Sequence, residues 1–152
     1  MLTETVQSND YSSKTHQMIH QLVDERQQML VLFCQVAGLE PYTCRKPLQD
    51  LLKEFCQVMV DYIAMGHFEV YQRIGEADGP NASYEALVRK LVPQIEAVTQ
   101  RAVAFNDKYC QDHYCSHLGQ LASDLSVLGE DLAARIELED RLIGELVDLS
   151  QH

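Results

Sequence analysis

The residues from Ser116 to Leu149 carry the feature that most constrains this fold. Large aliphatic side chains recur there at alternating steps of three and four residues, namely Leu118, Leu121, Leu125, Leu128, Leu132, Ile136, Ile143 and Leu146. This spacing lines one side of an α-helix and does not fit the two-residue period of a strand. Because a long helix with one apolar side must bury that side, the sequence predicts a bundle of helices.

Two further helices are predicted in the first half of the chain. The first runs from about Ser13 to Ala37, where Gly38 provides a C-terminal cap. Its apolar side is Ile19, Leu22, Val23, Met29, Leu30, Phe33 and Ala37. The second starts near Pro47, a residue suited to a first helical turn, and runs to about Ile74. Its apolar side is Leu52, Phe55, Met59, Tyr62, Ile63, Val70 and Ile74.

A third helix follows the segment GEADGPNAS, which is rich in turn-forming residues. Asn81 or Ser83 is a suitable cap for its start. Its apolar side includes Ile95, Val98, Ala102 and Phe105. Pro93 lies inside the helical pattern, so we expect the helix to be kinked or split there. The polar segment NDKYCQDHYCSH then leads to the last helix.

These elements predict an all-α fold, a single-domain antiparallel four-helix bundle. The chain has 152 residues, of which 46% are hydrophobic, which is enough for one domain with a substantial core. No strand-like alternation and no internal repeat is visible. The bundle is expected to span residues 13–150, and residues 1–12 are expected to form a disordered N-terminal tail.

The charge balance narrows the possible partners. The formal net charge is −11, and such a surface repels phosphate backbones, so direct binding to nucleic acid is disfavoured. A basic protein partner fits better, including one whose basic surface otherwise binds DNA. The N-terminal residues show no signal-peptide pattern, and no apolar run is long enough to span a membrane. With five cysteines, an odd number, the sequence predicts reduced thiols and a cytoplasmic location.

Two charged residues interrupt otherwise apolar helix sides. Arg26 lies in the middle of the first stripe, and Glu139 occupies the next apolar position after Ile136. Because a lone buried charge is too costly to keep, we expect the two to pair inside the bundle. Tyr62 and His67 are candidate members of the same interior polar network, whose expected role is structural. The alternative is that each charge lies near a bundle end and reaches water.

Two aromatic residues, Phe68 and Tyr71, fall on the otherwise polar side of the second helix. Asp61 lies two turns before Phe68 on the same side. An exposed aromatic pair beside a carboxylate is typical of a protein-binding hot spot. Coverage of the pair by another segment of the same chain is an equally open interpretation.

Catalytic and metal-binding patterns are weak. Cys110, His113, Cys115 and His117 are zinc-ligand types, but four ligands so close in one loop are geometrically awkward, so a polar loop is the preferred interpretation. His16 and His20 lie one helical turn apart without a third ligand and are expected on the surface. The Glu-x-x-His motifs of di-metal bundles are absent, as are phosphate-binding and nucleophile motifs. The chain is therefore expected to be no enzyme and to need no cofactor.

One segment resembles a known family. The stretch CQVMVDYIAMGHFEVYQRI, Cys56 to Ile74, is similar to the FCQxLVDYxSxGHFxxYERI segment of the Rsd/AlgQ family, bacterial regulators of sigma D. The segments ERQQMLVLF, LVPQIEAVTQ and ARIELEDRLIGEL agree with the family in order and spacing. The resemblance covers about residues 15–150.

The resemblance implies an all-α anti-sigma factor. Such proteins bind region four of the housekeeping sigma factor, a basic helix-turn-helix that reads the −35 promoter element and contacts core RNA polymerase. Sequestering this region lowers housekeeping transcription, typically in stationary phase. Family residues associated with sigma binding correspond to Asp61 and Phe68, and a third, usually Ser, is Ala64 here. Ala64 and Tyr71 are expected to flank the contact.

The sequence departs from the family in one further place, where HQLV, His20 to Val23, replaces the usual DRWL. The leading expectation is stoichiometric binding of sigma by a protein that is monomeric when free and associates with neither membrane nor nucleic acid. The main alternative is a bundle that binds a small ligand or metal through the interior polar cluster. Regulation of another partner through a different surface is a third possibility.

Overall fold

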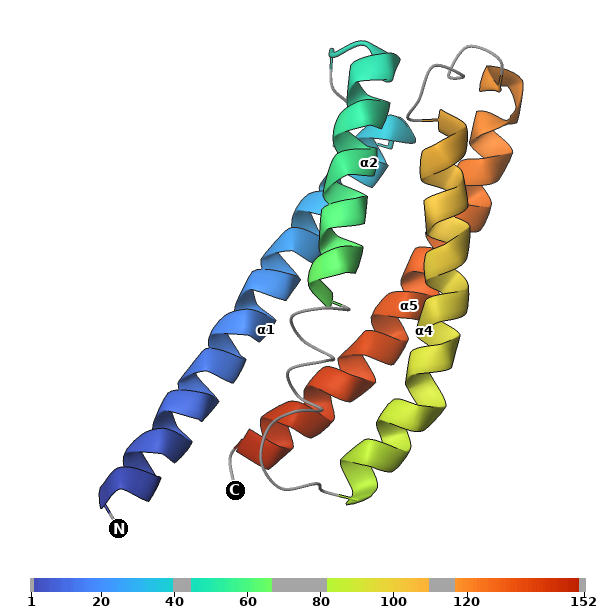
Figure 1. Cartoon of the computed structure of the whole chain (residues 1–152). Helices are drawn as coiled ribbons and strands as arrows, with labels where there is room; N and C mark the ends of the chain where they lie inside the picture. Colours follow the sequence, from blue (N-terminus) through green and yellow to red (C-terminus); the bar gives the residue numbers. More distant parts are fainter. Residues whose placement is uncertain (1, 40–44, 67–81, 110–116, 151–152) are drawn as a thin grey trace.

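In the part of the chain that the structure describes, the computed structural model of this protein contains four long helices that run alternately up and down the bundle (Figure 1). The structure describes residues 2–39, 45–66, 82–109 and 117–150, and the side chains of residues 14, 16–39, 45–66, 85–109 and 117–145. The helices in these parts are α1 (Leu2–Val36), α2 (Leu48–Met65), α4 (Ala82–Tyr109) and α5 (Leu121–Ser150). A short 3-10 helix, η3 (Leu118–Gln120), precedes α5.

The bundle is formed by two tightly associated helix pairs. α1 packs along α2, and α4 packs along α5; the pairs then meet through α2 with α4 and α1 with α5 (Figure 1). The core between them is continuous and includes Leu22, Met29, Phe55, Met59, Leu91, Phe105 and Leu132. The predicted all-α antiparallel four-helix bundle is confirmed.

α1 ends where the sequence predicted. Gly38 adopts a φ of 70°, in the left-handed region that glycine tolerates. The amide of Leu39 donates to the carbonyl of Cys34 at 2.9 Å, and the amide of Gly38 donates to the carbonyl of Gln35 at 3.1 Å. These two bonds form a Schellman motif, which satisfies carbonyls of the last turn. At its other end α1 begins at Leu2, because no Gly or Pro interrupts the polar N-terminal residues. The disordered tail expected over residues 1–12 stays a prediction.

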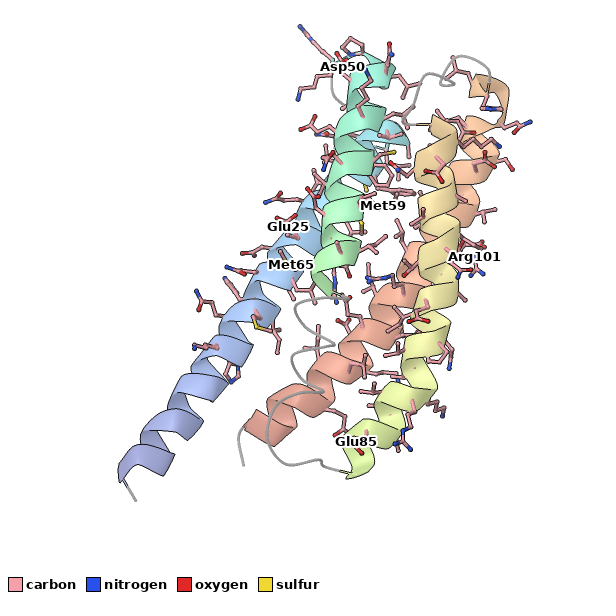
Figure 2. The ribbon with its side chains drawn as sticks, in the orientation of Figure 1. Glu25, Asp50, Met59, Met65, Glu85 and Arg101 are labelled. Carbon is pink, nitrogen blue, oxygen red and sulfur yellow. The ribbon has the colours of Figure 1, made fainter. Side chains whose placement is uncertain are left out.

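α2 follows the predicted pattern closely. Its buried side chains are Leu51, Leu52, Phe55, Cys56, Met59, Tyr62 and Ile63. Pro47 occupies the N-cap position, with its carbonyl accepting from the amides of Asp50 and Leu51 at 3.0 and 3.1 Å. Figure 2 shows Asp50 at this end of the helix and Met65 at the other. The continuation predicted as far as Ile74 lies outside the described residues.

α4 remains one continuous helix across Pro93. Its axis changes direction between the yellow-green start and the yellow middle in Figure 1, so the helix is bent and not split. Proline has no N–H for the Arg89 carbonyl four residues earlier, and the side-chain amide of Gln94 donates to the neighbouring Lys90 carbonyl at 3.1 Å. Of the two predicted caps, Asn81 lies outside the described residues, and Ser83 falls in the first turn of the helix.

Some predicted core positions are wrong by one residue. Val23 and Leu30 of α1 are exposed, as is Ala37 directly after the helix, whereas Val36 is buried. The buried residues Leu22, Met29 and Val36 are spaced by seven, which keeps one narrow side of the helix against its neighbours. Leu118 is also exposed, since it belongs to η3 and precedes the regular turns of α5.

The cysteines only partly match the expectation of reduced thiols. Cys34 is free, as predicted. Cys56, which is buried in α2, is disulfide-bonded, and its partner is outside the described residues. This expectation was therefore wrong for Cys56. Pairing depends on the distance between two cysteines in space, which an odd count along the chain does not reveal.

Two glycines of α5 provide a test of the packing. A Cβ on Gly144 meets nothing within 4 Å, whereas a Cβ on Gly129 would lie 3.0 Å from Cζ of Phe33. We therefore expect Gly144→Ala to stabilise the protein by about 0.4–1 kcal/mol, because alanine loses less backbone entropy in a helix. Gly129→Ala should gain clearly less, since the Phe33 ring must shift. Urea unfolding followed by circular dichroism measures both, and equal gains would contradict the close approach of Phe33.

Candidate functional site

One side of α2 is open to solvent along its whole described length. Its residues recur at helical spacing and are all exposed: Asp50, Lys53, Glu54, Gln57, Asp61 and Ala64. We call this set the α2 face. Asp61 and Ala64, two of the residues singled out from the sequence, thus lie where another protein can reach them. The other two, Phe68 and Tyr71, lie outside the described residues.

Two side-chain contacts organise the α2 face. The amide Nε2 of Gln57 donates to Oδ1 of Asp61 at 3.1 Å, one helical turn away. Nζ of Lys46 lies 3.1 Å from Oε2 of Glu54, where both side chains are about half exposed. Glu54 therefore has a cationic neighbour, whereas the contact to Asp61 comes from a neutral amide.

The opposite side of α2 contributes Tyr62 to a cluster of buried polar groups. Arg26 of α1, Tyr62 of α2, and Arg135 and Glu139 of α5 meet there; we call them the buried ionic network. Tyr62 and Glu139 are fully buried, Arg135 is 1% exposed, and the Arg26 side chain is 12% exposed. The structure thus brings together three of the four residues expected in an interior polar network. The fourth, His67, is outside the described residues.

Glu139 is at the centre of this network. Its Oε1 lies 2.7 Å from Nη2 of Arg26, and its Oε2 lies 3.0 Å from Nη1 of Arg135. The Tyr62 hydroxyl also donates to Oε1. Arg26 reaches further and contacts Oδ1 of the exposed Asp140 at 2.8 Å. One carboxylate therefore joins three helices, and each buried arginine has an acidic partner.

The arginines also pack against an aromatic ring. The guanidinium carbon of Arg135 lies 5.0 Å from the centre of the Tyr62 ring, within the range of a cation–π interaction. Nε of Arg26 is 3.4 Å from the Tyr62 hydroxyl, and Nε of Arg135 is 3.4 Å from Oγ1 of Thr99 on α4. Through Thr99 the polar cluster extends to α4, so that all four long helices contribute to it.

Burial and pairing act on the ionisation of this network. Burial opposes the charge of Arg26, but its hydrogen bonds to Glu139 and Tyr62 outweigh that effect and raise its pKa. Burial, reinforced by the charge of Glu139, raises the pKa of the Tyr62 hydroxyl above its usual value. The arginine therefore stays charged and the tyrosine neutral at physiological pH. Groups held in this way keep helices in place and are poor acid–base catalysts.

Sequence reasoning missed Arg135, a member of the buried ionic network, and also Thr99 and Asp140, which contact its two arginines. A signal for Arg135 exists, because it follows Leu132 by three residues and precedes Glu139 by four. The buried stripe of α5 thus runs through Leu132, Arg135, Glu139 and Leu142. The sequence interpretation instead continued the stripe through Ile136 and Ile143, which are only half-buried. A long basic side chain in a stripe is easily taken for a surface residue.

The structure offers little for a ligand or metal. Among the described residues, no group of three or more His, Cys, Asp or Glu could hold a metal ion. A surface groove of about 270 Å³ lies between α4 and α5, lined by Arg101, Ala104, Phe105, Lys108, Asp124, Val127, Leu128 and Asp131. Arg101, labelled on α4 in Figure 2, reaches across this groove to α5, with its Nε 2.9 Å from Oδ2 of Asp131. The groove shares no residue with the buried ionic network.

The start of α5 is fixed by a second polar cluster. Oδ2 of Asp124 accepts from the Tyr109 hydroxyl at 2.5 Å and lies 2.7 Å from Nζ of Lys108. Hydrogen bonds from Lys108 and Tyr109 lower the pKa of Asp124. His117 packs edge-on against Tyr109, with ring centres 6.4 Å apart. The other three candidate zinc ligands, Cys110, His113 and Cys115, lie outside the described residues.

The surface histidines lie where the sequence predicted. His16 and His20 are both exposed on α1, and His20 is 3.7 Å from Asp24.

In the HQLV segment, Leu22 occupies the position where the resembled family has Trp, and Leu22 is fully buried. This position therefore contributes to the core of the bundle. None of the described helices is long and apolar enough to cross a membrane.

Comparison with known proteins decides the family. A family model described as "Regulator of RNA polymerase sigma(70) subunit, Rsd/AlgQ" matches residues 1–147. The chain belongs to the Rsd/AlgQ family. The resemblance drawn from the DY-x-x-x-GHF segment is thereby confirmed, and the chain is a member of a family that regulates transcription through the sigma subunit.

Curated relatives agree with this assignment. The chain is 36% identical to the regulator of sigma D of Yersinia enterocolitica over 136 residues, which cover 85% of this chain and 80% of the relative. It is 37% identical to that of Yersinia pseudotuberculosis over the same length, covering 79% of the relative. A regulator of sigma D from an Enterobacter strain is 32% identical over 97% of this chain and 91% of its own length. No solved structure matches the chain significantly.

Proposed function

We propose that this protein is an anti-sigma factor that binds region four of the housekeeping sigma subunit. By covering that region it blocks the sigma contacts with core RNA polymerase and with the −35 promoter element. The protein acts by stoichiometric binding, as a monomer when free, and carries out no chemistry. Its place of action is the cytoplasm, and its effect is greatest in stationary phase.

The observation that carries this proposal is the exposure of Asp61 on the α2 face of a member of the Rsd/AlgQ family. A carboxylate on an exposed helix attracts a basic surface, and region four presents such a surface because it binds DNA. The net charge of −11 adds a long-range attraction toward the same basic surface. Ala64 lies one turn further along the same face and leaves room for the partner to approach.

The buried ionic network supports the same proposal. Arg26, Tyr62 and Glu139 come from three helices and are bonded to one another, so the polar groups of these three residues are already engaged within the protein. The role of the network is to hold α2 in place, so that the α2 face is presented on a rigid element. The alternative of a ligand- or metal-binding bundle has no comparable observation in its favour.

Direct binding tests the proposed function. The full chain should form a complex with the purified housekeeping sigma subunit in isothermal titration calorimetry and lose affinity as salt is raised. A sigma subunit lacking region four should not bind. The complex should also be unable to join core RNA polymerase. Undiminished binding to the truncated sigma subunit would contradict the assignment to region four, and absence of any binding would contradict the proposed function.

Phe68 provides a second test of the same surface. As a central aromatic anchor, Phe68→Ala should weaken sigma binding by about 2 kcal/mol or more. The partner of Phe68 would be an apolar pocket, and Tyr71 would lie at its edge. Titration of the variant against the sigma subunit measures the loss, and circular dichroism checks that the helices remain. A folded variant with unchanged affinity would remove Phe68 from the interface.

A further inference from the structure

The contact between Gln57 and Asp61 has a particular geometry on the α2 face. Gln57 precedes Asp61 by four residues, so its side chain lies one turn nearer the start of α2. Its Nε2 donates to Oδ1 of Asp61 at 3.1 Å, and both side chains are exposed. The contact therefore involves one carboxylate oxygen, while Oδ2 has no described intramolecular partner.

The chemical nature of the donor matters for binding. An exposed carboxylate on a helix samples several rotamers, and a cationic partner must pay for fixing one of them. The Gln57 amide favours one orientation in advance and carries no charge, so the attraction of Asp61 for a cation is preserved. Glu54 differs, because the ammonium group of Lys46 lies beside it and already balances its charge.

We infer that Gln57 is a positioning residue, which orients the Asp61 carboxylate for a cationic group of the sigma subunit without contacting sigma itself. This inference rests on the proposed function, since it assumes that Asp61 meets a partner. It assigns a role to a residue one turn before Asp61, in addition to Asp61, Ala64 and Phe68, the family positions associated with sigma binding. It also explains why a neutral amide, and not a lysine, is suitable at position 57.

The expected effect follows from the cost of ordering one side chain. Fixing a side chain with many rotamers costs a binding reaction enough to change the dissociation constant about two- to tenfold. Gln57→Ala should raise Kd for the sigma subunit by this factor. Alanine is the best helix former, so α2 should remain intact in the variant.

A double-mutant cycle tests the inference on the full chain. Four proteins are titrated against the purified housekeeping sigma subunit: the wild type, Gln57→Ala, Asp61→Ala and the double variant. If Gln57 acts through Asp61, Gln57→Ala raises Kd about two- to tenfold in the wild type and leaves it unchanged when Asp61 is already alanine. Gln49→Ala is the matched control, because Gln49 is an exposed glutamine of the same helix outside the α2 face.

Each outcome has a distinct meaning. An equal effect of Gln57→Ala in both backgrounds would overturn the inference, since Gln57 would then contact sigma directly or act through helix stability. No effect in the wild type, together with a loss for Asp61→Ala, would also overturn it while leaving the proposed function intact. If the wild type fails to bind sigma, the proposed function fails and the inference fails with it.

Discussion

Replacing Glu139 by glutamine should destabilise the protein by about 3–5 kcal/mol, the cost of leaving buried charges without their partner. Glu139 is fully buried and bonds Arg26, Arg135 and Tyr62. Glutamine keeps the size of the side chain but removes the negative charge, so the buried Arg135 would lose its acidic partner and Arg26 would keep only the exposed Asp140. Urea unfolding followed by circular dichroism measures the loss.

Glu137→Gln is the matched control for this experiment. Glu137 is an exposed residue of the same helix, two positions away, and the same chemical change there should alter stability by less than about 0.5 kcal/mol. If the two variants unfold at the same urea concentration, the buried ionic network contributes nothing measurable to the fold.

Removing the whole network should be far less harmful than removing its centre. Apolar side chains of similar volume often replace a buried ion cluster without loss of stability. The corresponding variant combines four substitutions: Arg26→Met, Tyr62→Phe, Arg135→Met and Glu139→Leu. We expect it to recover most of the stability that Glu139→Gln loses. A combined variant as unstable as Glu139→Gln would instead show that packing around position 139, and not unpaired charge, causes the loss.

Reversing the charge of Asp61 should nearly abolish sigma binding. In the proposed complex this residue faces a basic group of region four, and Asp61→Arg would bring two like charges together. Such a juxtaposition costs several kcal/mol, which corresponds to a loss of affinity of about a hundredfold or more. Calorimetric titration against the sigma subunit measures the effect at low and physiological salt.

A charge-matched control separates local contact from net charge. Glu130→Arg changes the net charge of the protein equally but lies on an exposed side of α5. It should weaken binding only slightly and mainly at low salt, through the loss of long-range attraction. Equal losses for Asp61→Arg and Glu130→Arg would show that Asp61 makes no specific contact.

Helix periodicity explains why the fold could be predicted and where the prediction was wrong. The stripes of α2 and α4 are regular enough that Met59, Tyr62, Ile95 and Phe105 are buried as predicted. In α1 the aliphatic residues Leu22 and Val23 are adjacent, and sequence gives no reason to prefer one. Packing against two neighbouring helices selects Leu22, because only a narrow side of α1 is covered.

The polar groups were predictable only where they contradicted a pattern. Arg26 and Glu139 could be noticed because each interrupts an apolar stripe, and the structure places their charged groups 2.7 Å apart. Arg135 did not interrupt the apolar stripe in the same way, because the adjacent Ile136 could be taken as the buried residue of that turn. The hydrogen bond from Gln57 to Asp61 was equally hidden, because four-residue spacing on a polar side is common and does not reveal which side chains meet.

The bond between Tyr62 and Glu139 has a consequence for the neighbouring residue. Successive side chains of an α-helix differ in direction by about 100°, so fixing Tyr62 toward the centre of the bundle fixes the azimuth of Asp61 as well. α2 cannot rotate about its own axis without breaking that bond. A substitution deep in the interior would thus alter the direction of the Asp61 carboxylate, and with it the recognition of the sigma subunit, without any substitution at the surface.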